Sequence, residues 1–157
     1  SNTWSEDWVA FFRDERLGYQ LQLAEENAAP ASAIDSGRLL MEKLPAFFDS
    51  YSPVPALLHG DLWGGNWSAL LDGTPVLYDP ASYFGDREAD LAMTELFGGF
   101  GSEFYAAFQA HSPITDGYPL RRELYNLYHM LNHLNLFGAA YLSRCQSIID
   151  GLLVQLN

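Results

Sequence analysis

Residues 57–66 of this chain read Leu57-Leu58-His59-Gly60-Asp61-Leu62-Trp63-Gly64-Gly65-Asn66. Two apolar residues lead into a His-x-Asp sequence, and an Asn stands five positions after the Asp. Further along, Asp72-Gly73 predicts the tight turn of a hairpin, because this dipeptide tolerates the positive φ angles of hairpin turns. The returning strand is the β-prone run Val76-Leu77-Tyr78, which ends in Asp79. An acidic residue, an amide and a second acidic residue are therefore expected around one small hairpin.

The spacing of Asp61 and Asn66 is typical of the catalytic loop of kinases and their relatives. In phosphoryl transfer an Asp orients the attacking hydroxyl and accepts its proton, while an Asn one loop turn later holds magnesium beside the phosphates. We therefore predict that Asp61 is a catalytic base. We predict that Asn66 and Asp79 are magnesium ligands, since this ion prefers hard oxygen donors. Each residue alone could be a turn former or a helix cap, but the ordered set favours a phosphotransferase.

Several stretches resemble the fructosamine kinase (ketosamine kinase) family, a branch of the kinase-like fold near the aminoglycoside phosphotransferases. The resemblance runs from about Trp8 to the end of the chain. Trp63 and the run Gly85-Asp86-Arg87-Glu88 distinguish this family from choline or aminoglycoside kinases. The stretches that carry the resemblance are His59-Gly60-Asp61-Leu62-Trp63-Gly64-Gly65-Asn66, Tyr78-Asp79-Pro80-Ala81, Tyr83-Phe84-Gly85-Asp86-Arg87-Glu88-Ala89-Asp90-Leu91-Ala92-Met93 and Leu131-Asn132-His133-Leu134-Asn135-Leu136-Phe137-Gly138.

The resemblance implies roles for further residues. His59 and Asp90 would support the catalytic loop, with Asp90 accepting hydrogen bonds from the loop backbone. His133 would lie on a helix that faces the substrate cleft, across from Trp63, whose ring would form a floor for a sugar. Arg87 is expected to pair with a nearby acid. The resemblance also implies ATP and Mg²⁺, a small-molecule glycated amine as substrate, and a part in protein deglycation.

The composition excludes other partners and compartments. The chain has 157 residues, of which 48% are hydrophobic, and a net charge of −12. So acidic a surface repels phosphate backbones and anionic lipids, and we expect no nucleic-acid or membrane partner. Cys145 is the only cysteine, which excludes a disulfide framework and favours the reducing cytoplasm. His129 and His133 have the spacing of paired zinc ligands, but no Glu follows the first His, so a zinc site is not expected.

The periodicity of apolar residues predicts an α+β fold that is mainly α-helical. With the resemblance, it predicts the C-terminal lobe of the protein-kinase-like fold, in which a small β-hairpin carries the catalytic loop. We expect one domain over 3–157, and read Gly98-Gly99 as a turn that ends a helix. Its expected parts are two packing helices in 3–50, the catalytic loop and hairpin in 57–81 with strands near 57–58, 67–71 and 76–78, and a helical substrate-side part in 86–156 with helices near 86–97, 102–111, 120–137 and 139–156.

Kinase catalysis also needs a glycine-rich loop over the phosphates, a strand Lys and a Glu that pairs with this Lys. Lys43 is the only lysine, and it precedes the catalytic loop on an expected helix. We therefore expect that the N-terminal nucleotide lobe is absent from this chain, that activity requires it, and that the isolated chain is inactive. Two alternatives stay open: an aminoglycoside or choline-type phosphotransferase, and a noncatalytic substrate-binding half-domain.

Overall fold

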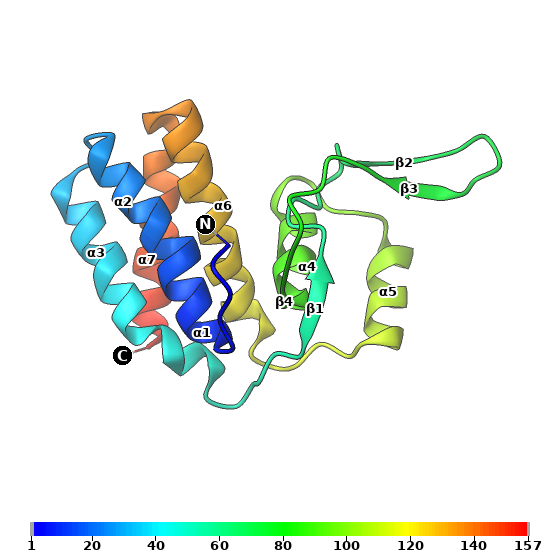
Figure 1. The fold of residues 1–157 in the computed structure, drawn as a ribbon, viewed down its shortest axis with the longest axis horizontal. Helices are drawn as coiled ribbons and strands as arrows, with labels where there is room; N and C mark the ends of the chain where they lie inside the picture. Colours follow the sequence, from blue (N-terminus) through cyan, green and yellow to red (C-terminus); the bar gives the residue numbers. More distant parts are fainter. Residues whose placement is uncertain (1, 157) are drawn as a thin grey trace. The chain divides into compact units, whose positions relative to one another are not determined.

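The structure, a computed structural model, describes residues 2–156. The chain packs as two compact units, one of Ser1–Ser52 with Glu123–Asn157 and the other of Pro53–Arg122. The sequence predicted one domain over 3–157, and the packing divides this region into these two units. The elements, in chain order, are α1 (Trp8–Phe11), the π-helix η1 (Phe12–Gly18), α2 (Tyr19–Glu26), α3 (Ala31–Lys43), the 3₁₀-helix η2 (Leu44–Phe48), β1 (Pro55–Leu58), β2 (Trp67–Ala69), β3 (Pro75–Leu77), β4 (Tyr83–Asp86), α4 (Arg87–Leu96), α5 (Ser102–His111), α6 (Tyr118–Phe137), the 3₁₀-helix η3 (Ala139–Tyr141) and α7 (Leu142–Gln155) (Figure 1).

The first unit is a bundle of helices whose first helix differs from the prediction. The apolar pattern predicted one packing helix from about Trp4. In the structure it begins at Trp8, because the carboxylate of Asp7 accepts a hydrogen bond from the backbone N–H of Ala10 (3.0 Å) and so caps the helix. Its middle part, Phe12–Gly18, is a π-helix. Figure 1 shows α2, α3, α6 and α7 lying side by side in this unit.

Aromatic and amide contacts join α6 to the N-terminal helices of the same unit. The indole N–H of Trp8 donates to the hydroxyl of Tyr125 (3.1 Å), and Phe12 meets the Tyr125 ring edge-on at 5.0 Å between centroids. The amide of Asn135 donates to the backbone carbonyl (2.9 Å) and to the side-chain oxygen (2.8 Å) of Gln20. These polar side chains thus have partners on facing helices, and the hydrogen bonds fix the register of α6 against α1 and α2.

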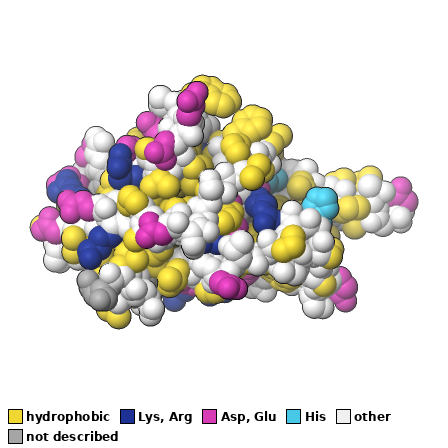
Figure 2. All heavy atoms as spheres, turned by 90° about the horizontal axis from the view of Figure 1, so that it is seen from below, with side chains coloured by type: hydrophobic (Ala, Val, Ile, Leu, Met, Phe, Trp, Pro, Cys, Tyr) yellow, Lys and Arg dark blue, Asp and Glu magenta, His cyan; other side chains and the backbone are white. Residues whose placement is uncertain are grey.

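The second unit contains two separate antiparallel strand pairs. β1 pairs with β4, with Leu58 opposite Tyr83, and β2 pairs with β3 in the hairpin that the sequence predicted. The sequence predicted strands near 57–58, 67–71 and 76–78, but it did not predict the strand Tyr83–Asp86, with which β1 pairs. This pairing is made between segments distant in sequence, so no local pattern indicated it. Figure 2 shows hydrophobic side chains exposed along the hairpin.

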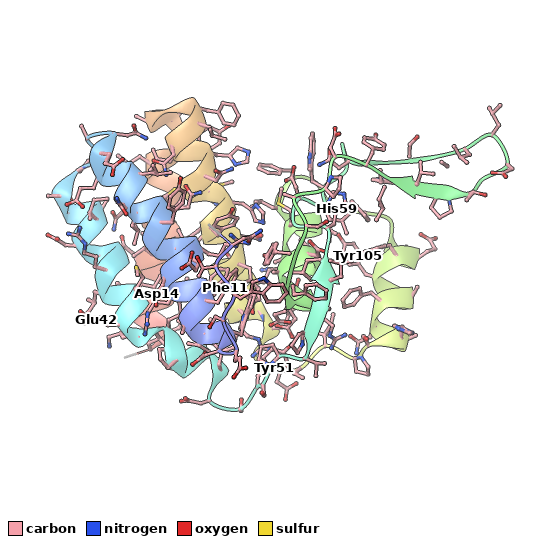
Figure 3. The ribbon with its side chains drawn as sticks, in the orientation of Figure 1. Phe11, Asp14, Glu42, Tyr51, His59 and Tyr105 are labelled. Atoms are coloured by element: carbon pink, nitrogen blue, oxygen red, sulfur yellow. The ribbon has the colours of Figure 1, made fainter. Side chains whose placement is uncertain are left out.

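Helices α4, α5 and α6 begin and end within two residues of the predicted bounds, whereas α7 begins at Leu142, three residues after the predicted start, because Ala139–Tyr141 form the 3₁₀-helix η3. α4 ends at Leu96, and Gly98 (φ 101°) and Gly99 (φ 76°) follow in the left-handed region, which confirms the turn after the helix. Tyr105 points from α5 toward α4 (Figure 3), where its hydroxyl lies 3.2 Å from Oγ1 of Thr94. The prediction of a mainly helical α+β fold is confirmed. In the described part of the chain, no helix combines the length and the hydropathy needed to cross a membrane.

The buried histidine on α6 leads to a prediction on pH. Burial lowers the pKa of His129 from 6.5 to about 3, with smaller contributions from the nearby charges of His133 and Arg16. A pKa lowered by folding contributes stability that is present above about pH 6.5 and is lost as the pH falls toward 3. At about 1.4 kcal/mol for each pKa unit, the loss is on the order of 5 kcal/mol.

We expect His129→Leu to remove most of this acid-induced loss, measured as the free energy of urea unfolding from pH 7 to pH 4. The same replacement at His111, which is exposed on α5, should leave the pH profile as it is in the parent chain. Parallel profiles for the parent chain and His129→Leu would contradict the assignment.

Candidate active site

The loop 59–66, which the sequence predicted to be catalytic, follows β1 directly, and a side chain of α4 bonds its first two residues. Asp86 ends β4 and caps α4, since its carboxylate accepts a hydrogen bond from the N–H of Glu88 (3.0 Å). One turn further on, the two oxygens of Asp90 accept the backbone N–H groups of His59 (2.7 Å) and Gly60 (2.8 Å). These are the hydrogen bonds that the sequence led us to expect for Asp90. Burial raises the pKa of Asp90, and the two backbone hydrogen bonds oppose this rise.

His59 joins the catalytic loop to the end of β3. Its Nε2 lies 3.0 Å from the carbonyl oxygen of Tyr78, and its Nδ1 lies 3.3 Å from the backbone nitrogen of Asp61. One neutral tautomer satisfies both contacts: Nε2–H donates to the carbonyl, and Nδ1 accepts from the amide. The backbone N–H of Ala81 also donates to the carbonyl of His59 (2.8 Å). Figure 3 shows His59 beside the base of the hairpin.

Asn66 and Asp61 lie in direct contact. The amide nitrogen of Asn66 donates to the backbone carbonyl of Asp61 (2.9 Å) and to its carboxylate oxygen Oδ2 (3.0 Å). Both amide hydrogens are therefore directed at Asp61, which leaves the carbonyl oxygen Oδ1 of the buried Asn66 on the other side of the amide group. The arrangement holds the carboxylate in one orientation and presents a neutral oxygen donor next to it.

Asp79 is exposed and lies in a strained backbone conformation at the end of the hairpin. Its φ angle is 53°, in the left-handed region that residues other than glycine seldom adopt. The preceding residue, Tyr78, is bonded to the catalytic loop through its N–H, which donates to the carbonyl of Asn66 (3.1 Å), and through its carbonyl, which accepts from His59. The structure thus anchors the residue before Asp79 to the loop that carries Asp61 and Asn66.

Trp63 lies on the surface of the same loop with 39% of its side chain exposed. Its ring meets Phe97 edge-on, with 6.3 Å between centroids. It also covers Gly65, where a Cβ atom would overlap the indole. One side of the Trp63 ring is packed and the other is exposed, so the ring is fixed in place and offers an aromatic surface two residues after Asp61.

His133 belongs to the other compact unit, and the expectation that it faces Trp63 stays a prediction. Its Nδ1 donates a hydrogen bond to the carbonyl of His129 (2.7 Å), one turn earlier on α6. The imidazole lies among aromatic rings, 5.4 Å from Phe137 and 5.2 Å from Tyr141 between centroids.

The expectation for Arg87 was wrong. Its guanidinium donates to the backbone carbonyls of Ser112 (2.8 Å) and Pro113 (2.8 Å) and covers the ring of Phe108, and no ion pair with an acid is found among the described residues. Carbonyl oxygens at the end of α5 provide the charge-assisted acceptors that we had assigned to an acid. The sequence pattern also missed the buried partner of Glu88, which is described below.

The sequence model of the family described as fructosamine kinase matches residues 1–155. The chain belongs to the fructosamine kinase family. It is 47% identical over 152 residues to a probable ketoamine kinase of Vibrio vulnificus, covering 97% of this chain and 51% of the relative. It is 45% identical over 156 residues to the chloroplastic protein-ribulosamine 3-kinase of Oryza sativa subsp. indica, covering 99% and 45%.

The solved structures agree with this membership. The crystal structure of a candidate fructosamine-3-kinase from Thermobifida fusca superposes with a TM-score of 0.87 at 32% identity, covering 98% of this chain and 54% of that chain. The kinase-like fold that the sequence led us to expect is thereby confirmed. This member of the fructosamine kinase family spans about half the length of the curated relatives that it matches.

The fixed loop leads to a prediction on stability. Gly60 has a φ of 83°, and a Cβ atom there would overlap the carbonyl oxygen of Ala81. We expect Gly60→Ala to lower the free energy of unfolding by about 2 kcal/mol or more, because the left-handed conformation and the overlap both oppose a side chain. Gly64→Ala is the matched control, since a Cβ atom at Gly64 would meet nothing within 4 Å. Equal losses in both variants, measured by urea unfolding, would show that the backbone of Gly60 is not constrained.

Proposed function

We propose that this chain carries the base and the metal ligands of an ATP-dependent kinase that phosphorylates a sugar hydroxyl of fructosamine-type ketoamines. The observation that supports the proposal most is the contact of Asn66 with the Asp61 carboxylate, in a loop held by Asp90 and His59. The names of the relatives, ketoamine kinase and protein-ribulosamine 3-kinase, favour a glycated amine over an aminoglycoside or choline as the substrate.

In the proposed reaction, Asp61 acts on the hydroxyl of the substrate. Its oxygen Oδ2 is held by Asn66, and its oxygen Oδ1 has no hydrogen-bond partner within residues 2–156. Oδ1 accepts the hydroxyl proton as the sugar oxygen forms its bond to the γ-phosphorus of ATP and the bond from that phosphorus to the β-phosphate oxygen breaks. The products are the sugar phosphate and ADP, and the proton resides on Asp61 until solvent removes it.

The residues present fit a magnesium site. The carbonyl oxygen of Asn66 and the carboxylate of Asp79 are hard donors, and two protein ligands suffice when phosphate oxygens and water complete the coordination. The hydrogen bonds of the Asn66 amide to Asp61 direct its carbonyl oxygen away from that carboxylate. When bound, magnesium would neutralise charge on the β- and γ-phosphates.

Substrate recognition is assigned to Trp63 and His133. The half-exposed Trp63 ring provides a flat apolar surface on which a sugar ring packs, beside the proposed base. His133 would bind a sugar hydroxyl or the amine-bearing part of the ketoamine. We further propose that the nucleotide lobe of the kinase-like fold is required for turnover, and that residues 1–157 alone are inactive, because the groups that hold the phosphates belong to that lobe.

The first test concerns the base, in a form of the protein that includes the nucleotide lobe. We expect Asp61→Asn to lower kcat by a factor on the order of 10² to 10⁴ and to leave ATP binding nearly unchanged, because an amide cannot accept the proton. Asp72→Asn, the same replacement at the exposed turn of the hairpin, is the control and should retain activity. A comparable loss of ATP affinity in Asp61→Asn would indicate a structural role for Asp61 instead.

The second test concerns the aromatic surface. Trp63→Ala should raise KM for the ketoamine about tenfold or more and leave KM for ATP nearly unchanged, because stacked aromatic contacts are lost only for the sugar. Trp67→Ala is the control, since this ring is exposed to a similar extent (41%) on β2 of the hairpin. Equal rises of both KM values in Trp63→Ala would mean that the indole only packs the loop.

A further inference from the structure

A buried ion pair lies in the second unit, outside the proposed site. The guanidinium of Arg121 donates from Nε to Oε2 of Glu88 (2.6 Å) and from a terminal nitrogen to Oε1 (3.0 Å). The two side chains are 1% and 0% exposed. Arg121 also donates to Oγ1 of Thr115 (2.6 Å), and a Cβ atom at Gly117 would overlap the guanidinium. The pair is bidentate, fully buried and closely surrounded.

This pair bonds α4, and α4 in turn bonds the loop of Asp61 through Asp90. Glu88 precedes Asp90 by two positions on α4, and two helical positions are about 200° apart around the axis. The two carboxylates therefore leave α4 on opposite sides. Asp90 bonds the backbone of His59 and Gly60, whereas Glu88 bonds Arg121, in the first turn of α6. Leu91, the residue after Asp90, is 1% exposed, so α4 is also held by apolar packing.

We propose that the Glu88–Arg121 pair is a positioning device for the reaction, which fixes the rotation of α4 and thereby the Asp90 carboxylate that orients the loop of Asp61. Its effect on catalysis rests on the proposed function, whereas its effect on the loop backbone does not. Glu88 and Arg121 act through α4 and the Asp90 carboxylate, so they are positioning residues.

The chemistry of the pair favours a role in orienting α4 over a role only in stabilising the fold. Apolar side chains of similar volume can replace a buried ion pair with little loss of stability, so cohesion alone does not call for charges here. Two parallel hydrogen bonds between planar groups, by contrast, fix the relative orientation of the residues that carry them. A second pair on the same helices, Glu95 with Arg122, is partly exposed (26% and 36%) and so is less constrained by its surroundings.

The test measures native-state hydrogen exchange of the His59 and Gly60 amides in the full chain. In the parent chain we expect both amides to be protected, because both are bonded to Asp90. The test variant is the double replacement Glu88→Met with Arg121→Met, which removes the directional bonds without leaving a buried charge unpaired. We expect exchange of the two amides to rise tenfold or more, with little change in the amides that exchange only by global unfolding. Glu95→Gln is the matched control on α4 and should leave both amides as in the parent chain.

Each other outcome overturns the proposal. Parent-like protection of both amides in a folded double variant would mean that α4 keeps its position without the pair. A uniform rise at all amides would mean that the pair contributes only to global stability, and unprotected amides in the parent chain would remove the premise. If the double variant does not fold, the test uses Arg121→Lys, which keeps the positive charge but cannot form the two parallel hydrogen bonds. Hydrogen exchange of the His59 and Gly60 amides is then measured in that variant, with the same expected rise.

Kinetics in a form with the nucleotide lobe provide a second readout. There the double variant should lower kcat tenfold or more with little change in KM. Absence of kinase activity in the parent protein, together with the expected exchange result, would contradict the proposed function and leave the role of the pair intact.

Discussion

The two hydrogen bonds from the His59 and Gly60 amides to the Asp90 carboxylate are the contact on which the candidate site depends. They join the residues that follow β1 to the first turn of α4, and β4 brings the start of α4 alongside β1. Without this pairing, the helix could not present a carboxylate to the first residues of the loop. The main role of the short strands β1 and β4 is therefore to bring α4 next to the loop.

The carboxylates of Asp90 and Asp61 have different surroundings in the candidate site, which suits them to different roles. Asp90 is partly buried, and burial raises its pKa against the effect of two backbone donors. Such a group is suited to bind backbone and is poorly placed to meet a substrate. Asp61 has one oxygen held by a neutral amide and the other without a partner in residues 2–156. This difference agrees with a structural role for Asp90 and with the proposed proton acceptor at Asp61.

Local patterns predicted what local interactions determine. The hairpin follows from Asp72-Gly73 between β-prone runs, and α5 has the bounds 102–111 that the apolar periodicity predicted. The spacing of Asp61 and Asn66 placed both in one loop, where they are in contact. The strand β4, the carbonyl partners of Arg87 and the partner of Glu88 depend on segments brought together by folding, so no residue near them in sequence indicated them. The π-helical turn Phe12–Gly18 likewise has the apolar spacing of an ordinary helix.

The proposed metal ligand Asp79 is tied to the same network as the proposed base. Tyr78, before it, is bonded through both backbone groups to Asn66 and His59, and Ala81, after it, donates to the carbonyl of His59. With bonds on both sides, the chain between Tyr78 and Ala81 has little freedom, and the left-handed φ of Asp79 is held by its neighbours. A segment fixed in this way cannot swing out without breaking three hydrogen bonds, two of them to His59. The departure from the Asp-Phe-Gly sequence of protein kinases to Asp79-Pro80-Ala81 agrees with this rigidity, because proline restricts the backbone where a mobile switch would need freedom.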